Sequence, residues 1–311
     1  MLNKETILLI GGTGFIGSNL LESLIKYNKK TNYLIVVLSR KTLKNETNNI
    51  LYVKGDYSDV TFLKELFSKW NFTKVFHFAN TTTPLTSNNN LINDIKFNLK
   101  PTLSLLEIMR EFGCKFILFI SSGGAIYGDK QIEKINENEI CNPISSYGVV
   151  KLKIENYLKF HQKQFGINYL ILRVSNPFGQ FHASEKQGII NIAIRKALQG
   201  KNIEIWGDGN QTKDYIYIKD LIEIIHLLLN KKIINKIINI GTGEAHELNE
   251  ILLVINKYLP NLKVKYLESI STDVKNFCLD ISLLQSFINY KFTSFDESIK
   301  ATIEYEREKL I

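Results

Sequence analysis

The 311-residue sequence predicts an α/β fold: a doubly wound parallel sheet with a smaller C-terminal lobe. Three observations predict it. A short apolar run over 7–10 ends in three glycines with the spacing G-x-x-G-x-x-G. Apolar strand-like segments and amphipathic helix-like segments then alternate as far as about Pro177, which is typical of a parallel sheet with helices on both faces. After Pro177 this alternation breaks, which indicates a separate lobe.

The N-terminal stretch predicts a strand, a tight turn and a helix, whose apolar face carries Ile16, Leu20, Leu21, Leu24 and Ile25. In such a turn the first glycine, Gly11, allows the bend, and the second, Gly14, lets a pyrophosphate approach the backbone. The third, Gly17, lets the helix pack on the strand. The helix N-terminus adds oriented N–H groups and a partial positive charge. In this context the pattern favours a Rossmann-type dinucleotide site over a glycine turn without a ligand.

The other elements follow in chain order. Strands are expected at 33–38, 50–54, 75–79, 116–121 and 169–174, and helices at 60–70, 98–112 and 145–165. A polar segment, 179–188, precedes a helix at 189–199 and a short strand at 203–206. A helix at 214–229 and a strand at 237–241 are expected to return to the main sheet. We therefore expect a dinucleotide-binding domain over 1–175 and a mostly substrate-binding lobe over 176–311, with about 214–243 returning to the first domain.

Composition limits the classes of function. The formal net charge of +8 comes mainly from dispersed lysines, so it favours a solvated surface, with attraction of a small anionic substrate as the alternative, over nucleic-acid binding. No apolar run approaches the roughly 18 residues of a membrane span, and no secretory signal is visible, so a cytoplasmic protein is expected. The three scattered cysteines and five histidines show no metal-ligand spacing.

The second expected strand ends at Ser39-Arg40 without an acid. A carboxylate at this point binds the ribose 2′-hydroxyl of NAD, whereas an arginine accommodates the 2′-phosphate of NADP. Taken alone, Arg40 favours NADP, and the alternative is that it simply stacks or faces solvent. Asp56 follows the third strand, where its carboxylate could accept a hydrogen bond from the adenine amino group.

Ser121 and Ser122 follow a buried strand, and Tyr147 and Lys151 come about 25 residues later. Residues at i and i+4 share one face of a helix, so the lysine ammonium is expected to lie beside the phenol. An adjacent cation favours the phenolate and lowers a pKa that is normally near 10. Tyr147 would then serve as a general base and acid near neutral pH.

These motifs together resemble the nucleotide-sugar epimerase/dehydratase family of extended short-chain dehydrogenases/reductases, typified by UDP-glucose 4-epimerase. The likeness covers nearly the whole chain. The matching segments, in family order, are the glycine turn, 75–79, Asn98, 121–128, Tyr147/Lys151, 172–177, 206–209 and 214–216.

The resemblance implies site residues. Gly11, Gly14, Phe15 and Ile16 would wrap the pyrophosphate, Asp56 and Tyr57 would flank the adenine, and Phe78, Ala79 and Asn98 would line the nicotinamide side, with Ser121 and Arg40 also near the cofactor. Lys151 would hold the nicotinamide ribose as well. Asn176 and Lys213 would bind the phosphates of the sugar nucleotide. The implied cofactor is NAD, and NADP remains open because of Ser39-Arg40.

Three departures from the family pattern refine the expected reaction. Gly123 stands where many relatives have Ser or Thr, so Ser122 becomes the expected donor to the sugar oxygen. Gly124 and Ala125 stand where sugar dehydratases have Asp-Glu, so dehydration is disfavoured. Lys213 replaces the usual phosphate-binding arginine and keeps its charge without the bidentate fork.

The expected activity is nucleotide-sugar 4-epimerisation by transient oxidation at C4, with Tyr147, Lys151 and Ser122 as catalytic residues. The nearest alternative is an NAD(P)-dependent nucleotide-sugar 4-dehydrogenase or 4-ketosugar reductase. A non-catalytic nucleotide-binding protein is the alternative from another class. The resemblance also implies a homodimer formed through the helices at 98–112 and 145–165, and a role in supplying glycan precursors is typical of the class.

Overall fold

The computed structural model describes residues 5–27, 33–41, 49–130, 132–268 and 276–310. The chain divides into two compact units. The first comprises Met1–Ile126, Ser145–Arg173 and Lys232–Ile237, and the second comprises Tyr127–Ile144, Val174–Lys231 and Ile238–Ile311. In this division 127–144 clusters with the second unit, and of the segment 214–243 only Lys232–Ile237 clusters with the first.

The central sheet has seven parallel strands in the order β10-β6-β5-β4-β1-β2-β3, which confirms the predicted fold class. Its strands are β1 (Thr6–Ile10), β2 (Leu34–Ser39), β3 (Ile50–Lys54), β4 (Lys74–His77), β5 (Phe116–Ser122), β6 (Asn168–Val174) and β10 (Lys236–Ile240). The chain runs outward from β1 to β3 and then returns to pair β4 with β1. The strand order therefore reverses between β1 and β4, and in such sheets the ligand binds at the carboxyl ends of the strands at this point.

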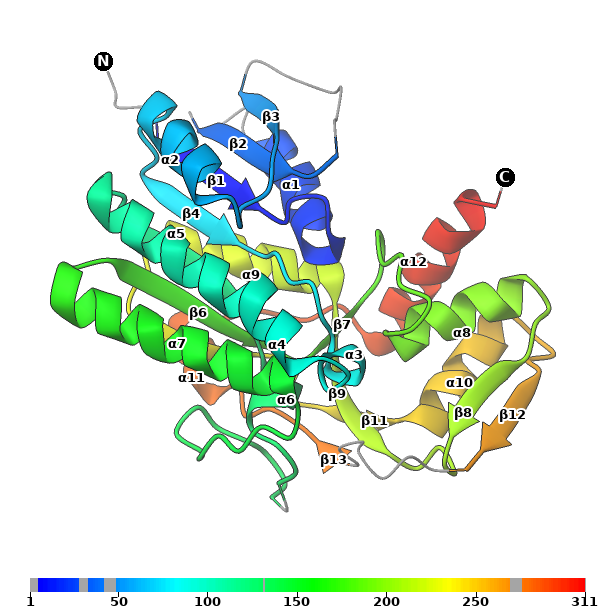
Figure 1. Ribbon diagram of the computed structural model, residues 1–311. Helices are drawn as coiled ribbons and strands as arrows, with labels where there is room; N and C mark the ends of the chain where they lie inside the picture. Colours follow the sequence, from blue (N-terminus) through cyan, green and yellow to red (C-terminus); the bar gives the residue numbers. More distant parts are fainter. Residues whose placement is uncertain (1–4, 28–32, 42–48, 131, 269–275, 311) are drawn as a thin grey trace. The chain divides into compact units, whose positions relative to one another are not determined.

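Helices cover the sheet of the first unit. Figure 1 shows α2 (Val60–Lys69), α5 (Lys100–Glu111) and α7 (Ser146–Phe165) layered on one face. Alternate residues of the strands, such as Leu8 and Ile10, join these helices in one apolar core. The remaining strand residues face the other side, where α1 (Phe15–Tyr27) buries Leu20, Leu21 and Leu24. Ile25 was expected on this buried face but is 41% exposed.

The helix predicted over 98–112 corresponds to α5 (Lys100–Glu111), and the connection that leads to it from β4 has further short helical elements. This connection contains α3 (Pro84–Ser87), α4 (Leu91–Asp94) and a π-helical turn, η1 (Ile95–Leu99). Pro101 is compatible with the start of α5, because proline is tolerated in the first turn of a helix. A short helix, α6 (Gly123–Ile126), follows β5.

The second unit contains two small sheets and five helices among its described residues. Strand β9 (Thr212–Tyr217) pairs with β7 (Asn176–Phe178), β11 (Ala245–Glu247) and β13 (Asn276–Phe277), while β8 (Ile203–Trp206) pairs with β12 (Val264–Leu267). The helices are α8 (Ile189–Leu198), α9 (Ile218–Asn230), α10 (Leu248–Tyr258), α11 (Ser282–Phe287) and α12 (Phe295–Glu308).

The prediction of a single helix over 214–229 is wrong, because its first residues form β9. Tyr215, Ile216 and Tyr217 are residues that favour strands, and all three are buried. The buried carboxylate of Asp214 also fixes this strand, since it accepts hydrogen bonds from the backbone N–H groups of Thr242 and Leu279. The helix begins only at Ile218.

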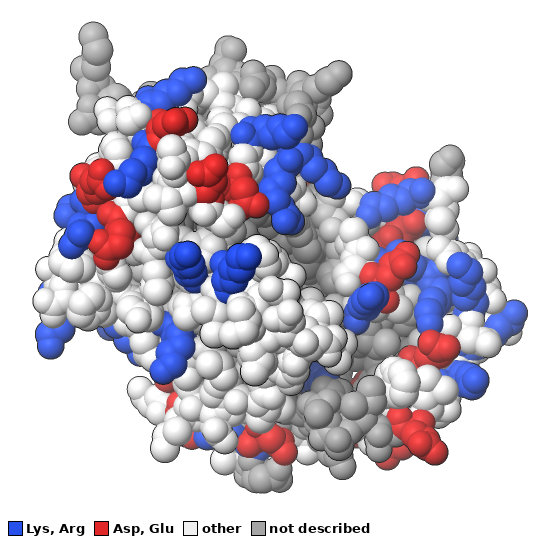
Figure 2. All heavy atoms as spheres, viewed as in Figure 1, with Lys and Arg blue, Asp and Glu red and all other residues white. Residues whose placement is uncertain are grey.

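In the part of the chain that the structure describes, no helix is both long enough and apolar enough to cross a membrane. On the face shown in Figure 2, lysines and arginines are interspersed with acidic side chains. Such mixing of the two signs is typical of a solvated surface.

Candidate active site

The turn from β1 to α1 is built for close approach by a ligand. Gly11 has a φ of +84°, and a Cβ there would lie 2.5 Å from the backbone nitrogen of Ala79. A Cβ on Gly17 would lie 2.1 Å from the carbonyl oxygen of Gly11. At Gly14, by contrast, a Cβ would meet only the Gly11 oxygen, at 3.3 Å. Gly11 and Gly17 therefore allow the turn and the packing. Gly14 leaves open space beside the start of α1 at Phe15 and Ile16, as a pyrophosphate requires.

The end of β4 lies against this turn. The backbone N–H of Phe78 donates to the carbonyl oxygen of Ile10 at 2.8 Å, so Phe78 and Ala79 continue the pairing of β4 with β1 past its last strand residue. This brings together the glycine turn and the residues predicted to line the nicotinamide side.

The expected adenosine end lies beyond β2 and β3. Arg40 is exposed, and Asp56 accepts a hydrogen bond from the backbone N–H of Ser58 at 2.8 Å. Tyr57 does not present its ring at this surface. It is 8% exposed, belongs to the apolar core and donates its hydroxyl to the carbonyl oxygen of Phe97 at 2.8 Å. Burial places the apolar ring inside and raises the pKa of its phenol. The expectation that Tyr57 flanks the adenine stays a prediction.

Asn98 is held by hydrogen bonds within the protein. Its side-chain oxygen accepts from the backbone N–H of Thr81 at 2.9 Å, and its amide nitrogen donates to Asp94 Oδ1 at 2.7 Å and to Thr82 Oγ1 at 3.2 Å. The side chain is 2% exposed. Because both ends of the amide are occupied within the protein, Asn98 fixes the loop after β4. Its place on the nicotinamide side stays a prediction.

Tyr147 and Lys151 lie one turn apart on α7, as predicted. The helix is started by Ser145, whose hydroxyl accepts from the backbone N–H of Gly148 at 3.2 Å. Lys151 is 3% exposed, and its ammonium donates to the carbonyl oxygen of Ile120 at 2.8 Å. Its Nζ lies 5.6 Å from the centroid of the Tyr147 ring.

Ser122, at the end of β5, completes this group. Its hydroxyl is close enough to the Tyr147 phenol to lower the pKa of that group. The backbone N–H of Ala125 donates to the other side of Ser122 Oγ at 3.4 Å. The structure therefore brings together Ser122, Tyr147 and Lys151, the three residues predicted to be catalytic.

The predicted direction of the Tyr147 pKa is wrong for the chain without ligands. Burial raises the pKa of Tyr147 to about 12, and this outweighs the lowering effect of Ser122. Burial also lowers the pKa of Lys151 to about 7, although the charges of Glu155 and Asp94 oppose that shift. The spacing in the sequence predicted the neighbouring cation, but not that both groups would be removed from water.

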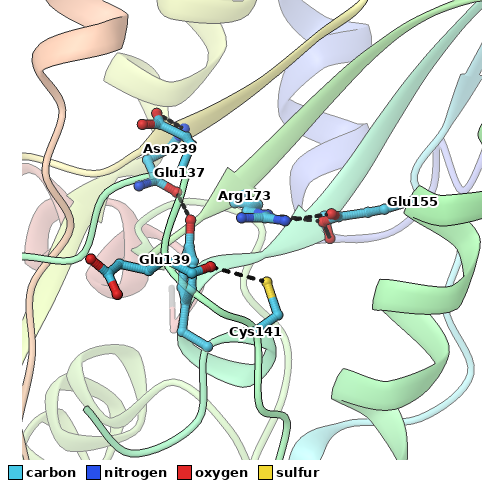
Figure 3. A network of polar contacts seen from close by, with 8 residues as sticks. Glu137, Glu139, Cys141, Glu155, Arg173 and Asn239 are labelled. Carbon is cyan, nitrogen blue, oxygen red and sulfur yellow. Dashed lines mark hydrogen bonds and ion pairs between the residues drawn. The ribbon is translucent and has the colours of Figure 1, made fainter. Parts of the chain in front are cut away.

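Ser121 is occupied by a buried ion pair that the sequence analysis missed. Its hydroxyl donates to Glu155 Oε1 at 2.7 Å, and the Arg173 guanidinium binds both oxygens of the same carboxylate, through Nε at 3.1 Å and Nη2 at 2.7 Å. Figure 3 shows this pair between α7 and β6. Because the Ser121 hydroxyl donates its proton to Glu155, its oxygen can only accept a hydrogen bond from a cofactor. The expected cofactor contact of Ser121 stays a prediction. The sequence did contain a sign of this ion pair. Glu155 follows Lys151 by four residues, as Lys151 follows Tyr147, so all three lie on one face of α7.

The residues expected to bind substrate phosphates belong to the second unit. Asn176 begins β7 and donates its amide to the carbonyl oxygen of Asp214 at 2.8 Å. Lys213 lies on β9, and pairing of Asn176 with Tyr215 places the two predicted residues in one small sheet. Among the residues described, no group of three His, Cys, Asp or Glu side chains could hold a metal ion.

A glycine turn at the strand-order reversal, together with a Ser-Tyr-Lys group at the end of β5, defines a dinucleotide-dependent enzyme of the short-chain dehydrogenase/reductase class. Comparison with known proteins gives the family. Residues 7–241 match the model of the NAD dependent epimerase/dehydratase family, so the chain belongs to that family.

Individual relatives share most of their length with this chain. A protein of Methanocaldococcus jannaschii, provisionally named a UDP-glucose 4-epimerase, is 37% identical over 80% of this chain and 81% of its own. Thermotoga maritima UDP-glucose 4-epimerase, in a crystal structure with UDP-glucose, has 31% sequence identity to this chain. The two structures superpose with a TM-score of 0.90, and the match covers 98% of this chain and 100% of the other. The Thermus thermophilus UDP-glucose 4-epimerase complex with NAD is 26% identical, with a TM-score of 0.89 over 97% and 99%.

Proposed function

We propose that this chain is a nucleotide-sugar 4-epimerase that retains NAD and acts on a uridine-diphosphate sugar. The observation that carries the proposal is the contact of Ser122 and Lys151 with Tyr147 at the edge of the sheet that also holds the glycine turn. The UDP-glucose and NAD held by the two similar crystal structures support the choice of substrate and cofactor.

The residues present fit a dinucleotide. The cradle at Gly14 accepts a pyrophosphate, and Lys151 lies beside Tyr147 where a nicotinamide ribose is expected. Bound NAD supplies a hydride-accepting ring whose positive charge favours the phenolate of an adjacent tyrosine. Arg40, which follows β2, is compatible with the 2′-phosphate of NADP. The choice of NAD over NADP is therefore based on the similar crystal structures and not on the residues at the end of β2.

Tyr147 performs the proton transfers in this proposal. Its oxygen removes the proton of the sugar 4-hydroxyl while C4 loses a hydride, which leaves a 4-keto sugar. After the sugar turns, the hydride returns to the opposite face of C4 and Tyr147 gives its proton back to the oxygen. Burial raises the pKa of the phenol to about 12 in the chain without ligands, so removal of the sugar proton depends on nearby positive charges that favour the phenolate.

Ser122 and Lys151 assist by hydrogen bonding and charge. The Ser122 hydroxyl already contacts Tyr147 and is placed to bond the reacting sugar oxygen. Lys151 stabilises negative charge on the phenol oxygen. Gly124 and Ala125 offer no carboxylate next to the sugar, so loss of water from the 4-keto sugar is disfavoured.

The test is inversion at C4. Purified protein is incubated with UDP-glucose, UDP-galactose and their N-acetyl forms without added cofactor, and the products are followed by NMR. Interconversion of either pair supports the proposal, and no inversion of any nucleotide sugar refutes it. Stoichiometric change in absorbance at 340 nm during turnover would instead support the dehydrogenase or reductase.

We also propose a homodimer formed through the exposed face of the helices beside this site. Seven large apolar side chains are accessible on α4, η1 and α7: Leu91 (55% exposed), Ile92 (71%), Ile95 (46%), Phe97 (39%), Val149 (42%), Tyr157 (41%) and Phe160 (49%). Both α4 and η1 pack against α7, so these residues belong to one helical layer. Burying such a layer against a second copy would remove apolar surface from water.

A further inference from the structure

Four charged side chains are buried in the described part of the first unit. Asp94 and Glu155 are 0% exposed, and Lys151 and Arg173 are 3% exposed. A buried charge is costly unless a nearby charge or several hydrogen bonds compensate it. The pairing of these two acids with the two bases therefore determines how the positive charge of Lys151 is stabilised.

Arg173 and Glu155 satisfy each other. Two guanidinium N–H groups reach the two carboxylate oxygens, and Ser121 adds a third donor. The charge of Glu155, one turn away, raises the pKa of Lys151 although the carboxylate is also paired with Arg173. Lys151 itself donates to a neutral acceptor, the carbonyl oxygen of Ile120.

Asp94 has no cation of its own. Its Oδ1 accepts from two neutral donors, Thr82 Oγ1 and Asn98 Nδ2, each at 2.7 Å. Its Oδ2 is buried and has no hydrogen-bond donor. No ion pair of Asp94 is present among the residues that the structure describes. The carboxylate is therefore held by hydrogen bonds on one side and is electrostatically unbalanced on the other.

Asp94 lies on elements that pack against the helix of the catalytic pair. It ends α4 and enters the π-helical turn η1, and both elements pack against α7, which carries Tyr147 and Lys151. Its charge raises the pKa of both groups. Of the other titratable groups around Lys151, Glu155 is paired, and His77 on β4 is neutral, because burial and the charge of Lys151 lower its pKa to about 3.

We propose that Asp94 is a positioning residue that acts, together with Glu155, as a counter-charge of Lys151. It does so from within the protein, anchored by Thr82 and Asn98, without touching substrate or cofactor. The expected effect of Asp94 on the reaction rate rests on the proposed epimerase function. The expected effect of Asp94 on the titration of Tyr147 does not.

The first test is Asp94→Asn, which removes the charge and keeps the shape. Loss of the anion should move the midpoint of the Tyr147 ring-carbon titration, read by ¹³C NMR and assigned with Tyr147→Phe, to lower pH by about one unit. In the epimerase assay both limbs of the pH–rate profile should move the same way. Thr82→Val is the matched control, because it removes a donor to Asp94 and leaves the charge; its midpoints should stay in place.

A variant that merely disturbs structure would lower activity at every pH with unchanged midpoints, and that result would overturn the proposal. If Asp94→Asn does not fold, Asp94→Ser is the second variant, because it also removes the charge. Its Tyr147 midpoint should move to lower pH in the same way, and an unchanged midpoint would contradict the assignment. If no nucleotide sugar is turned over, the proposed function fails, while the Tyr147 titration still tests the role of Asp94.

Discussion

Glu155 and Arg173 form an ion pair from which water is excluded, with side chains 0% and 3% exposed and a shortest N–O distance of 2.7 Å. Breaking such a pair from one side leaves an uncompensated charge in the core. We expect Arg173→Met to lower the free energy of unfolding by about 3–5 kcal/mol, measured by denaturant titration. The double variant Glu155→Met/Arg173→Met should recover most of that loss, and equal losses in the single and double variants would contradict the ion-pair explanation.

Substitution of the three catalytic residues should separate chemistry from cofactor binding. Tyr147→Phe removes the group that exchanges the proton, so kcat should fall by at least about 10²-fold. Native mass spectrometry should still find NAD on this variant. Ser122→Ala should have a smaller effect, of about tenfold, since one hydrogen bond is lost. Turnover by Tyr147→Phe within a factor of two of the unmodified protein would favour a non-catalytic role for the phenol.

Two glycines of the first turn should respond differently to alanine. A Cβ at Gly17 would lie 2.1 Å from the Gly11 oxygen and 2.8 Å from the Gly12 Cα, so Gly17→Ala should cost about 1–3 kcal/mol of folding stability. Gly14→Ala meets only one atom, at 3.3 Å, and should leave stability within about 1 kcal/mol.

The same methyl group at Gly14 would occupy the space needed by the pyrophosphate. NAD affinity should therefore fall by roughly tenfold or more in Gly14→Ala, measured by calorimetry on protein stripped of cofactor. Unchanged affinity would show that the phosphates lie elsewhere.

Burial of His77 should make the protein less stable in acid. Its folded pKa is about 3, below the usual 6.5, so between these values the unfolded chain binds a proton that the folded chain does not. Stability therefore rises with pH from 3 to 6.5 and is lost as the pH falls through that window, by up to about 5 kcal/mol. His77→Asn should flatten this part of the pH–stability curve, whereas a curve parallel to that of the unmodified protein would refute the assignment.

The dimer proposal predicts a mass in solution of twice the 35.8 kDa of the chain. Placing charges in the exposed helical layer, with Ile92→Glu and Phe160→Glu together, should yield the monomer in light scattering. Leu253→Glu is a matched control, because Leu253 is equally apolar and 71% exposed but lies on α10 in the other unit. A monomeric unmodified protein at micromolar concentration would contradict the proposal.

Local patterns in the sequence predicted the features that depend on local geometry. The glycine spacing predicted the turn before α1, and the i, i+4 spacing predicted that Lys151 lies beside Tyr147. The direction of the Tyr147 pKa was missed because it depends on how strands and helices pack around α7. The pairing of Glu155 with Arg173 joins residues 18 positions apart on α7 and β6, and could not be derived from spacing alone. The boundary between β9 and α9 was missed because Tyr217 and Ile218 carry no turn residue between them.

The π-helical turn at Ile95–Leu99 has a consequence for how this region can change in evolution. From Leu91 to Glu111 the chain is helical almost without interruption, and η1 adds a wider turn between α4 and α5. Each residue of a helix rotates the chain by about 100°. An insertion or deletion of one residue between Asp94 and α5 would turn Asp94 away from α7, while α5 would keep its packing on the sheet. Homologous sequences should therefore keep a constant length across this stretch, even where the identities of its surface residues drift.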